Sequence, residues 1–271
     1  MRAFFLKRYK QIKPDFDIDK SNVREALRVN TLKTTHEEVL ARLRKEKATL
    51  EKIPFLKDGY YYSSPNFSLG STAEYLLGYY YIQEAASQAA SEALNPKKGE
   101  VVLDMCASPG SKTTHIAQLM ENKGKIIALD NNERRLYALR NNIERVGAKN
   151  TIIFNKDARY TSDLGITFDK VLLDAPCSGN FTLEEDWFDK RTLEDIKANS
   201  KVQRQLLEEA VSVLKDKGTM VYSTCSLEPE ENEEIIAWGE DKLGIKVVSQ
   251  KRYWPDEHGT QGFFIAVIKK K

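Results

Sequence analysis

The sequence has few cysteines and no long apolar run. Its 271 residues include three cysteines, an odd number that does not make a disulfide framework, and no Cys-x-x-Cys or Cys/His spacing suggests a metal site. No stretch approaches the roughly 18 apolar residues of a membrane span, and the apolar patch at the N-terminus is too short for a secretory signal. These absences favour a cytoplasmic protein with reduced thiols, no metal and no membrane partner.

Net charge is also small, but it is unevenly distributed. Residues 1–60 contain nine Lys and six Arg against nine acidic residues, so their net charge is +6, and that of the remainder is −4 within a total of +2. A basic segment on a mildly acidic body is typical of a nucleic-acid binder, because phosphate contacts dominate affinity. A solvated charged surface would give the same composition.

Internal repeats and low-complexity tracts are absent, and the chain is long enough for a large and a small domain. Residues 1–70 predict a small basic α+β domain, with strands at 26–33, 50–53 and 59–63 and a helix at 35–47.

The larger domain, residues 71–271, begins with a predicted long helix. Ser71 is expected as its N-cap, with Glu74 at the capping-box position, and the helix is expected to reach Leu94 before Asn95-Pro96 stops it. Apolar strands then alternate with amphipathic helices, which predicts a doubly wound α/β domain with a mainly parallel sheet. The expected strands are 101–105, 125–130, 151–155, 170–174, 219–223, 245–248 and 263–268, and the expected helices are 112–121, 133–146, 199–215 and 232–243.

Polar and thiol side chains follow the first five predicted strands of this sheet, at the point where each strand ends. They are the loop 104–110, then Asp130, Asp157, Asp174 with Cys177, and Cys225. Because the carboxyl ends of parallel strands meet at one edge, where ligands bind, we expect these residues to surround a single site.

The first of these loops lacks the pattern of a phosphate-binding loop. A Walker loop needs glycine where this chain has Cys106 and Ser111, and the fingerprint GxGxxG is absent, which argues against ATP and NAD. The Pro-Gly turn at 109–110 instead opens a helix whose N–H groups can face a ligand. Asp130 suits a ribose diol and Asp157 an adenine amine, although each also suits a helix N-cap. Together they predict a nucleoside site without polyphosphate, such as one for S-adenosylmethionine.

Two loops carry cysteines in surroundings that favour thiol chemistry. Asp174 precedes a proline-rigidified turn with Cys177, where a partly desolvated carboxyl can hold or donate a proton. Cys225 lies among hydroxyls, and a thiolate is a good nucleophile when nearby cations or helix N–H groups stabilise it. Lys112, on the neighbouring loop, is expected to serve either Asp174 or Cys225. Cys106 follows a strand of Val and Leu and is interpreted as a packing residue.

Four motifs in this order resemble the Nol/Nop/Sun family of RNA cytosine-5 methyltransferases. They are DMCASPGSKTT, IIALDNN, DAPCSG and STCSLEPEENE. The resemblance also includes RVNTLK, YIQEAAS and HGTQGFFIA, so it spans most of the chain. The compact size is most similar to the archaeal tRNA members of that family.

The resemblance implies a class I S-adenosylmethionine-dependent methyltransferase with a Rossmann-like, seven-stranded sheet whose last strand is antiparallel. It assigns the nucleophile to Cys225 and the release of the methylated product to Cys177. DNA cytosine methyltransferases use the cysteine after the proline instead, so the choice between the two thiols rests on the resemblance. Arg135 is a further cofactor candidate, for which a helix-surface role is the alternative. The implied cofactor contacts are Cys106, Ala107, Ser108, Pro109, Gly110, Ser111, Lys112, Asp130, Asp157 and Asp174.

This chemistry needs both a thiol and an acid, because C5 of cytosine is a poor nucleophile. Addition of the Cys225 thiolate to C6, with Asp174 supplying or holding a proton at N3, makes an enamine whose C5 attacks the sulfonium methyl group. Loss of the C5 proton, with Cys177 or water as the candidate base, and expulsion of the thiol then restore the ring.

The expected substrate is tRNA, with ribosomal RNA or DNA as alternatives. An idle RNA-binding protein on the same fold is the alternative from another class, and the two loop cysteines with the intact SPGSK loop argue against it. The basic N-terminal domain is expected to recognise RNA, with Tyr60, Tyr61 and Tyr62 either stacking on bases or packing in the core. An archease-type helper protein is a candidate partner.

Overall fold

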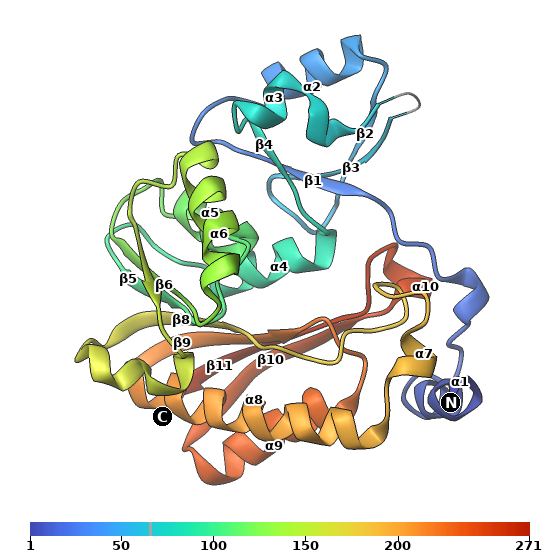
Figure 1. Ribbon diagram of the computed structural model, residues 1–271, viewed down its shortest axis with the longest axis vertical. Coiled ribbons are helices and arrows are strands. Elements are labelled where there is room, and N and C mark those ends of the chain that lie inside the picture. The colour runs from blue at the N-terminus through green and yellow to red at the C-terminus, as the bar shows by residue number, and fades with distance from the viewer. Residues whose placement is uncertain (65–66) are drawn as a thin grey trace.

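The protein consists of two α/β units, one above the other in the computed structural model (Figure 1). The structure describes residues 1–64 and 67–271. A seven-stranded sheet with helices on both faces makes the larger unit, and a four-stranded antiparallel sheet makes the smaller one. The predicted doubly wound sheet and the small N-terminal α+β unit are therefore both confirmed.

The large sheet has the strand order β10-β11-β9-β8-β5-β6-β7. Strands β5 to β9 pair in parallel, whereas β11 runs antiparallel to both β9 and β10, as expected of the last strand. All seven predicted strands are present. Because β6 and β8 lie on opposite sides of β5, the chain order reverses there, and a crevice at the carboxyl ends is the usual result. The strands are β5 Val101–Asp104, β6 Lys125–Asp130, β7 Thr151–Asn155, β8 Phe168–Asp174, β9 Leu214–Thr224, β10 Ile245–Tyr253 and β11 Phe263–Lys270.

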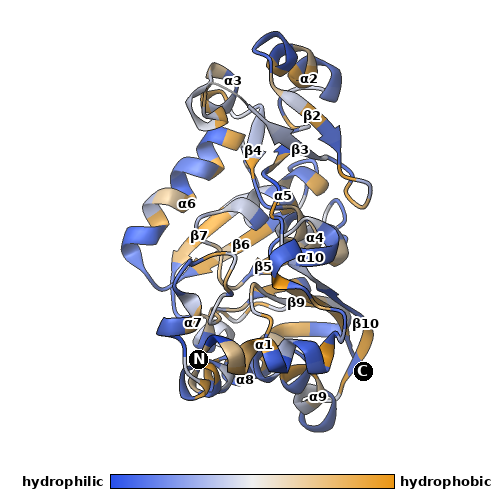
Figure 2. Cartoon of the chain, turned by 90° about the vertical axis from the view of Figure 1, so that its right-hand side faces the viewer, coloured by the Kyte–Doolittle hydropathy of each residue, from blue (hydrophilic) through white to orange (hydrophobic). Residues whose placement is uncertain are grey.

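Helices cover both faces of this sheet because successive strand residues point to opposite sides. Leu103 packs in the cluster that includes residues of α8 and α9, whereas its neighbour Val102 packs in the cluster that includes α4 and α5. Figure 2 shows apolar strands between helices that carry many hydrophilic residues. The helices are α4 Ala85–Leu94, α5 Ser111–Leu119, α6 Glu133–Val146, α8 Leu193–Val213 and α9 Glu233–Lys242. Helix α8 begins before the predicted residue 199 because Thr192 and Asp195 form a capping box.

The small sheet has the order β2-β3-β1-β4. The three strands and the helix predicted within residues 26–63 are present, whereas β4 was not predicted. Helix α2 buries Val39 and Leu43 against Leu27 and Val29 of β1. These elements are β1 Ala26–Val29, β2 Thr49–Lys52, β3 Gly59–Ser63, β4 Tyr80–Ile82 and α2 His36–Lys45. The remaining helices are α1 Arg2–Ile12, α3 Ala73–Leu76, α7 Trp187–Lys190 and α10 Pro255–His258, with 3-10 helices η1 Ile18–Lys20, η2 Leu69–Ser71, η3 Ala158–Leu164 and η4 Pro229–Glu231.

The long helix expected from Ser71 to Leu94 is wrong. The segment instead contains α3, capped by Thr72, then β4, then α4. Gly78 separates the first two, because its φ is +75° and a Cβ there would lie 1.9 Å from the carbonyl oxygen of Arg145. The aromatic residues that follow pair with β1 as an edge strand. Tertiary pairing thus overrides the helical pattern.

The small sheet extends beyond residue 70. Strand β4 carries its sheet to Ile82, and helix α1 packs on the large unit, where the ring centroids of Phe5 and Trp187 are 4.8 Å apart. Tyr60 and Tyr61 are 9% and 5% exposed, so they pack in the core, which is one of the two roles left open for them. Tyr62 is half-buried, and its hydroxyl donates to Glu25.

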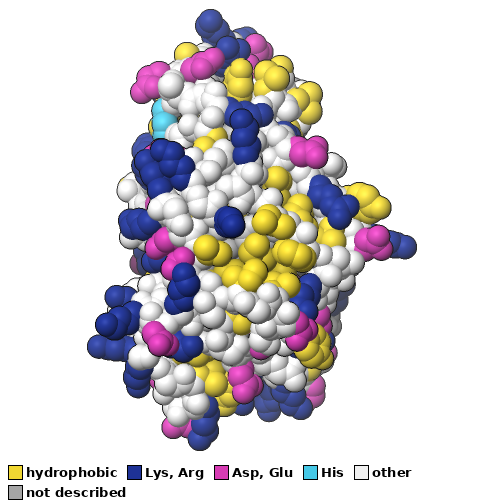
Figure 3. All heavy atoms as spheres, turned by 90° about the vertical axis from the view of Figure 1, so that its left-hand side faces the viewer, with side chains coloured by type: hydrophobic (Ala, Val, Ile, Leu, Met, Phe, Trp, Pro, Cys, Tyr) yellow, Lys and Arg dark blue, Asp and Glu magenta, His cyan; other side chains and the backbone are white. Residues whose placement is uncertain are grey.

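The outer surface mixes charges of both signs. On the face shown in Figure 3, Lys and Arg side chains are spread among acidic ones, and apolar side chains gather near its middle. No helix of residues 1–64 and 67–271 combines the length and apolarity needed to cross a membrane.

Candidate active site

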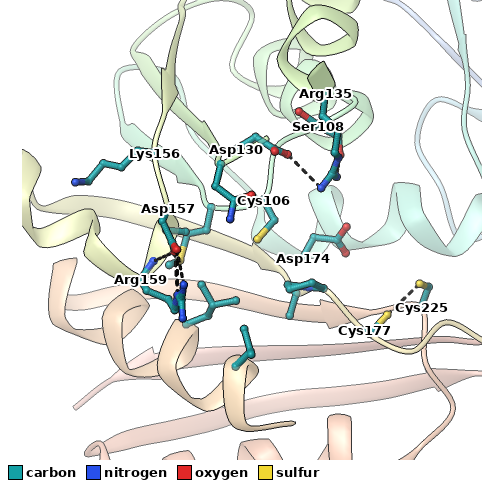
Figure 4. Close-up of a pocket in the computed structure, with 17 residues that line it drawn as sticks. Cys106, Ser108, Asp130, Arg135, Lys156, Asp157, Arg159, Asp174, Cys177 and Cys225 are labelled. Carbon is teal, nitrogen blue, oxygen red and sulfur yellow. Dashed lines mark hydrogen bonds and ion pairs between the residues drawn. The ribbon is translucent and has the colours of Figure 1, made fainter. Parts of the chain in front are cut away.

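A cavity of about 410 Å³ opens at the carboxyl ends of β5, β6, β7, β8 and β9 (Figure 4). It lies where the strand order predicts a crevice. The predicted site residues that line it are Cys106, Ser108, Asp130, Arg135, Asp157, Asp174, Cys177 and Cys225. Lys112 is not among the residues that line the cavity, but its Nζ donates a hydrogen bond to Asp174, which does line it. The structure therefore brings side chains from five separate loops to one edge of the sheet.

The loop after β5 is held by backbone conformation and by helix α6. Gly110 precedes α5 with a φ of +106°, a conformation that residues with a side chain rarely adopt. Arg135 donates from Nη2 to the carbonyl oxygen of Ser108 at 2.8 Å, and Asn142 donates to that of Pro109 at 2.9 Å. Arg135 thus positions the loop, in addition to lining the cavity.

The two acids predicted to bind a nucleoside both line the cavity, but only Asp157 is also a helix cap, because the cap of α6 is Asn132. Asp130 is 4% exposed and accepts from the backbone N–H of Asn132, with Arg135 Nη1 3.5 Å from its other oxygen. Asp157 accepts from the N–H of Arg159 as the cap of η3 and pairs with the Arg159 guanidinium at 2.6 Å. The ion pair lowers the pKa of Asp157. Both therefore present carboxylates to the cavity.

Asp174 is at the centre of the charged part of the site. It accepts from Lys112 Nζ and from the Ser223 hydroxyl, each at 2.7 Å, and is 27% exposed. Burial lowers the pKa of Lys112, but attraction to Asp174 outweighs burial, and the pKa is raised overall. Of the two partners expected for Lys112, the structure pairs it with Asp174.

Cys177 and Cys225 face each other across the end of the cavity, with 3.1 Å between their sulfur atoms (Figure 4). Both are free thiols. The hydrogen bond with Cys225, together with burial, raises the pKa of Cys177 well above that of an ordinary thiol. Either sulfur can be the donor in this hydrogen bond.

Asp104 and Cys106 lie at the start of the loop that follows β5, where Asp104 is buried and Cys106 is half-buried. Cys106 packs against the large core, as its packing interpretation predicts, and burial raises its pKa, although it also lines the cavity. Asp104 is 1% exposed and accepts from Thr113 Oγ1 at 2.7 Å, and burial raises its pKa to about 7. The sequence places Asp104 in the loop 104–110 but assigns it no role of its own, because its burial depends on the packing of α5 over the strand.

Sequence reasoning also missed the residues that hold the two cysteine loops together. Buried Glu231 accepts from the backbone N–H and the hydroxyl of Ser178, beside Cys177. Asn180, in the loop of Cys177, donates from Nδ2 to the carbonyl oxygen of Cys225 in the other loop at 2.7 Å. Asn232 donates to that of Ser226. The segment LEPEEN, which follows Cys225 and contains Glu231 and Asn232, is the sequence signal that could have found these two residues.

Comparison with known protein families agrees with this arrangement. Residues 91–239 match the family described as 16S rRNA methyltransferase RsmB/F, which is more than half of the chain. The chain belongs to the RsmB/F family. Residues 4–85 in addition match the N-terminal domain of 16S rRNA methyltransferase RsmF. The resemblance to the Nol/Nop/Sun family, of which RsmB/F proteins are members, is confirmed.

The names of three similar proteins give two classes of RNA, tRNA for two of them and ribosomal RNA for the third. The tRNA (cytosine(72)-C(5))-methyltransferase of Pyrococcus horikoshii is 42% identical over 76% of this chain and 57% of its own length. The tRNA (cytosine(49)-C(5))-methyltransferase of Pyrococcus abyssi is 37% identical over 92% of this chain and 88% of its own length. The ribosomal RNA small subunit methyltransferase F of Shewanella woodyi is 34% identical, over 92% and 57%. The chain thus spans little more than half of two of these relatives.

Solved RsmB/F-like structures share the whole fold. A methyltransferase homolog from Pyrococcus horikoshii superimposes with a TM-score of 0.91 at 39% identity and covers 99% of this chain and 95% of its own. NSun6 from the same organism, solved with SFG, superimposes with a TM-score of 0.89 at 29% identity, over 97% of each chain. The class I methyltransferase fold is therefore established.

Proposed function

We propose that this protein is an S-adenosylmethionine-dependent RNA cytosine-5 methyltransferase that forms 5-methylcytidine in tRNA. The observation that carries the proposal is the pair of thiols 3.1 Å apart, beside the Asp174–Lys112 ion pair, at the carboxyl edge of a methyltransferase sheet. A thiol nucleophile and a proton-holding acid are the two groups that activation of cytosine requires.

The cavity fits S-adenosylmethionine in size and in its donor set. A volume of about 410 Å³ is within the usual range of small-molecule sites. Asp130 and Asp157 offer carboxylates for the ribose and the adenine amine, and the buried Ser108 hydroxyl in the loop has no hydrogen-bond partner among the described residues. The loop Cys106, Ala107, Ser108, Pro109, Gly110, Ser111 and Lys112, with Arg135 and Asp174, completes the proposed site. The cofactor supplies an electrophilic methyl group.

Cys225 is the proposed nucleophile. Its sulfur adds to C6 of cytosine, and Asp174 holds a proton at N3 of the ring, which places the electron pair on C5. Lys112 and Ser223 keep Asp174 in position through their hydrogen bonds. Either sulfur can donate in the hydrogen bond between Cys177 and Cys225, so the assignment of the nucleophile to Cys225 rests on the family resemblance.

Cys177 is the proposed group for product release. After methyl transfer, the C5 proton leaves, with Cys177 or water as the base, and the bond between Cys225 and C6 breaks, which returns the electron pair to sulfur. The location of Cys177 beside Cys225, with 3.1 Å between the two sulfur atoms, suits this step.

A tRNA substrate is supported by the names of the two Pyrococcus relatives, at 42% and 37% identity. Ribosomal RNA is the second candidate, supported by the Shewanella relative. The small N-terminal unit is proposed to recognise RNA, and the target base must leave its stack at a cost of a few kcal/mol. A cytoplasmic location and an archease-type helper remain predictions.

Incubation of the protein with methyl-labelled S-adenosylmethionine and separate tRNA, ribosomal RNA and DNA tests this proposal. We expect label in tRNA, recovered as 5-methylcytidine after nuclease digestion and mass spectrometry. Label in ribosomal RNA alone would overturn the tRNA assignment, and labelling of none of the three would overturn the activity.

A further inference from the structure

We infer that helix α1 holds the loop of Cys177 and the loop of Cys225 in a fixed position relative to each other, with Arg8 as the positioning residue. We call this double contact of α1 the clamp. The inference rests on the proposed function, because it concerns how Cys225 and Cys177 reach their reactive arrangement. Helix α1 lies far from the small sheet in the structure, against α7 and the large unit (Figure 1). It therefore packs on the large unit and not on the small sheet.

On one side, α1 contacts the loop that follows Cys225. Arg8 Nη2 lies 2.6 Å and 2.8 Å from the two carboxylate oxygens of Glu230, and 3.2 Å from Glu228 Oε2. Glu228 is three residues beyond Cys225 and fully buried, and the Arg8 side chain is 21% exposed. Charge-assisted hydrogen bonds in such partly buried surroundings are stronger than surface pairs. Arg8 thus fixes the loop just after the nucleophile.

On the other side, α1 contacts the residues that hold the loop of Cys177. The ring of Phe5 packs edge-on against Trp187, and Trp187 Nε1 donates to the carbonyl oxygen of Ser178 at 2.8 Å. Ser178 immediately follows Cys177. Tyr9 lies on the same face of α1, with its ring centroid 6.3 Å from that of Phe181 in the same loop. Phe5, Arg8 and Tyr9 are spaced i, i+3 and i+4, so one helix face reaches both loops.

This double contact matters because the two sulfur atoms must stay close and aligned. Glu231 and Asn180 connect the loops from within, while α1 connects them from outside. A displacement of about 1 Å between reacting groups can cost about a hundredfold in rate. None of the residues that line the cofactor cavity belongs to α1. The clamp is therefore expected to affect the chemical step without changing cofactor affinity.

A basic helix could instead contact RNA directly, so the test must separate the two roles. Lys7 is the matched control, because it neighbours Arg8 on α1, carries the same charge and is exposed. Loss of either residue removes one positive charge from α1, but only Arg8→Ala breaks the contact with Glu228 and Glu230.

The experiment compares the wild type with Arg8→Ala, Arg8→Lys and Lys7→Ala in three measurements. These are single-turnover methylation at saturating tRNA and S-adenosylmethionine, dissociation constants for both ligands, and the rate of Cys225 alkylation by iodoacetamide, followed by mass spectrometry without RNA. For Arg8→Ala we expect a single-turnover rate lower by about tenfold or more, with both dissociation constants within about twofold of wild type. Its alkylation rate is expected to change severalfold. We expect Arg8→Lys to restore part of the methylation rate and part of the alkylation rate. Lys7→Ala is expected to match the wild type in both.

Wild-type methylation and alkylation rates in Arg8→Ala would overturn the clamp. Equal losses in Arg8→Ala and Lys7→Ala with weaker tRNA binding would also overturn it, because α1 would then be an RNA contact. If the wild type methylates no RNA, the proposed function fails, and the alkylation rates still decide whether α1 positions Cys225. If Arg8→Ala does not fold, Glu230→Gln, which keeps the shape but weakens the pair, decides by the same measurements.

Discussion

Asp104 allows a test of the electrostatics below the cofactor loop. Its carboxyl is 1% exposed, one oxygen accepts from Thr113, and the other has no hydrogen-bond partner among the described residues. Burial raises its pKa to about 7, and the nearby charge of Asp174 adds to this effect. In the unfolded chain an aspartate has a pKa of about 3.9.

The sign and size of the effect follow from these two values. Because the native state holds this proton more tightly than the unfolded state, the contribution of Asp104 to the free energy of unfolding is fully present below about pH 4. It falls as pH rises and is lost once pH passes the folded value of about 7. A difference of about three pKa units, at about 1.36 kcal/mol each, amounts to a loss of about 4 kcal/mol.

Asp104→Asn isolates this contribution, because an asparagine oxygen can still accept from Thr113. We expect the variant to gain about 4 kcal/mol relative to the wild type between pH 4 and pH 8, measured by urea unfolding monitored by circular dichroism. Glu234→Gln, which removes an exposed carboxylate, is the control and should give a nearly constant difference. A difference between Asp104→Asn and wild type that does not change with pH would refute the reasoning.

Further outcomes are expected for four variants. Cys225→Ala abolishes methyl transfer, whereas Cys177→Ala accumulates a covalent protein–RNA adduct, seen as a shifted band on a denaturing gel. An adduct formed by the Cys225 variant would reverse the two roles. Asp130→Asn raises the dissociation constant for S-adenosylmethionine by about tenfold or more in calorimetry, and an unchanged constant would remove Asp130 from the cofactor site. Gly78→Ala lowers the free energy of unfolding by about 3 kcal/mol or more, because its Cβ would meet the carbonyl oxygen of Arg145 at 1.9 Å. Wild-type denaturant midpoints for that variant would contradict the account of the turn.

The strands of the large sheet were predictable because each is a short apolar run that ends in a distinctive residue. Asp130, Asp174 and Cys225 could be assigned to one edge from the sequence, since parallel strands bring their carboxyl ends together. The segment 71–94 was misread because its local pattern suits a helix, whereas Gly78 and the pairing of β4 with β1 decide its structure.

The sequence by itself determined the sheet, its ligand-binding edge and the motifs that indicate the chemistry, because these depend on periodicity and on residue types near one another in the chain. Only the tertiary structure decided what surrounds the two thiols. Glu231, Asn180 and Arg8 are far apart in the sequence, and their contacts with the cysteine loops arise when α1 and the residues after Cys225 pack against the large unit. Tertiary packing also sets the burial of Asp104, which lies under α5, and that of Cys177. Burial is the physical cause that raises the pKa of Asp104 and contributes to that of Cys177.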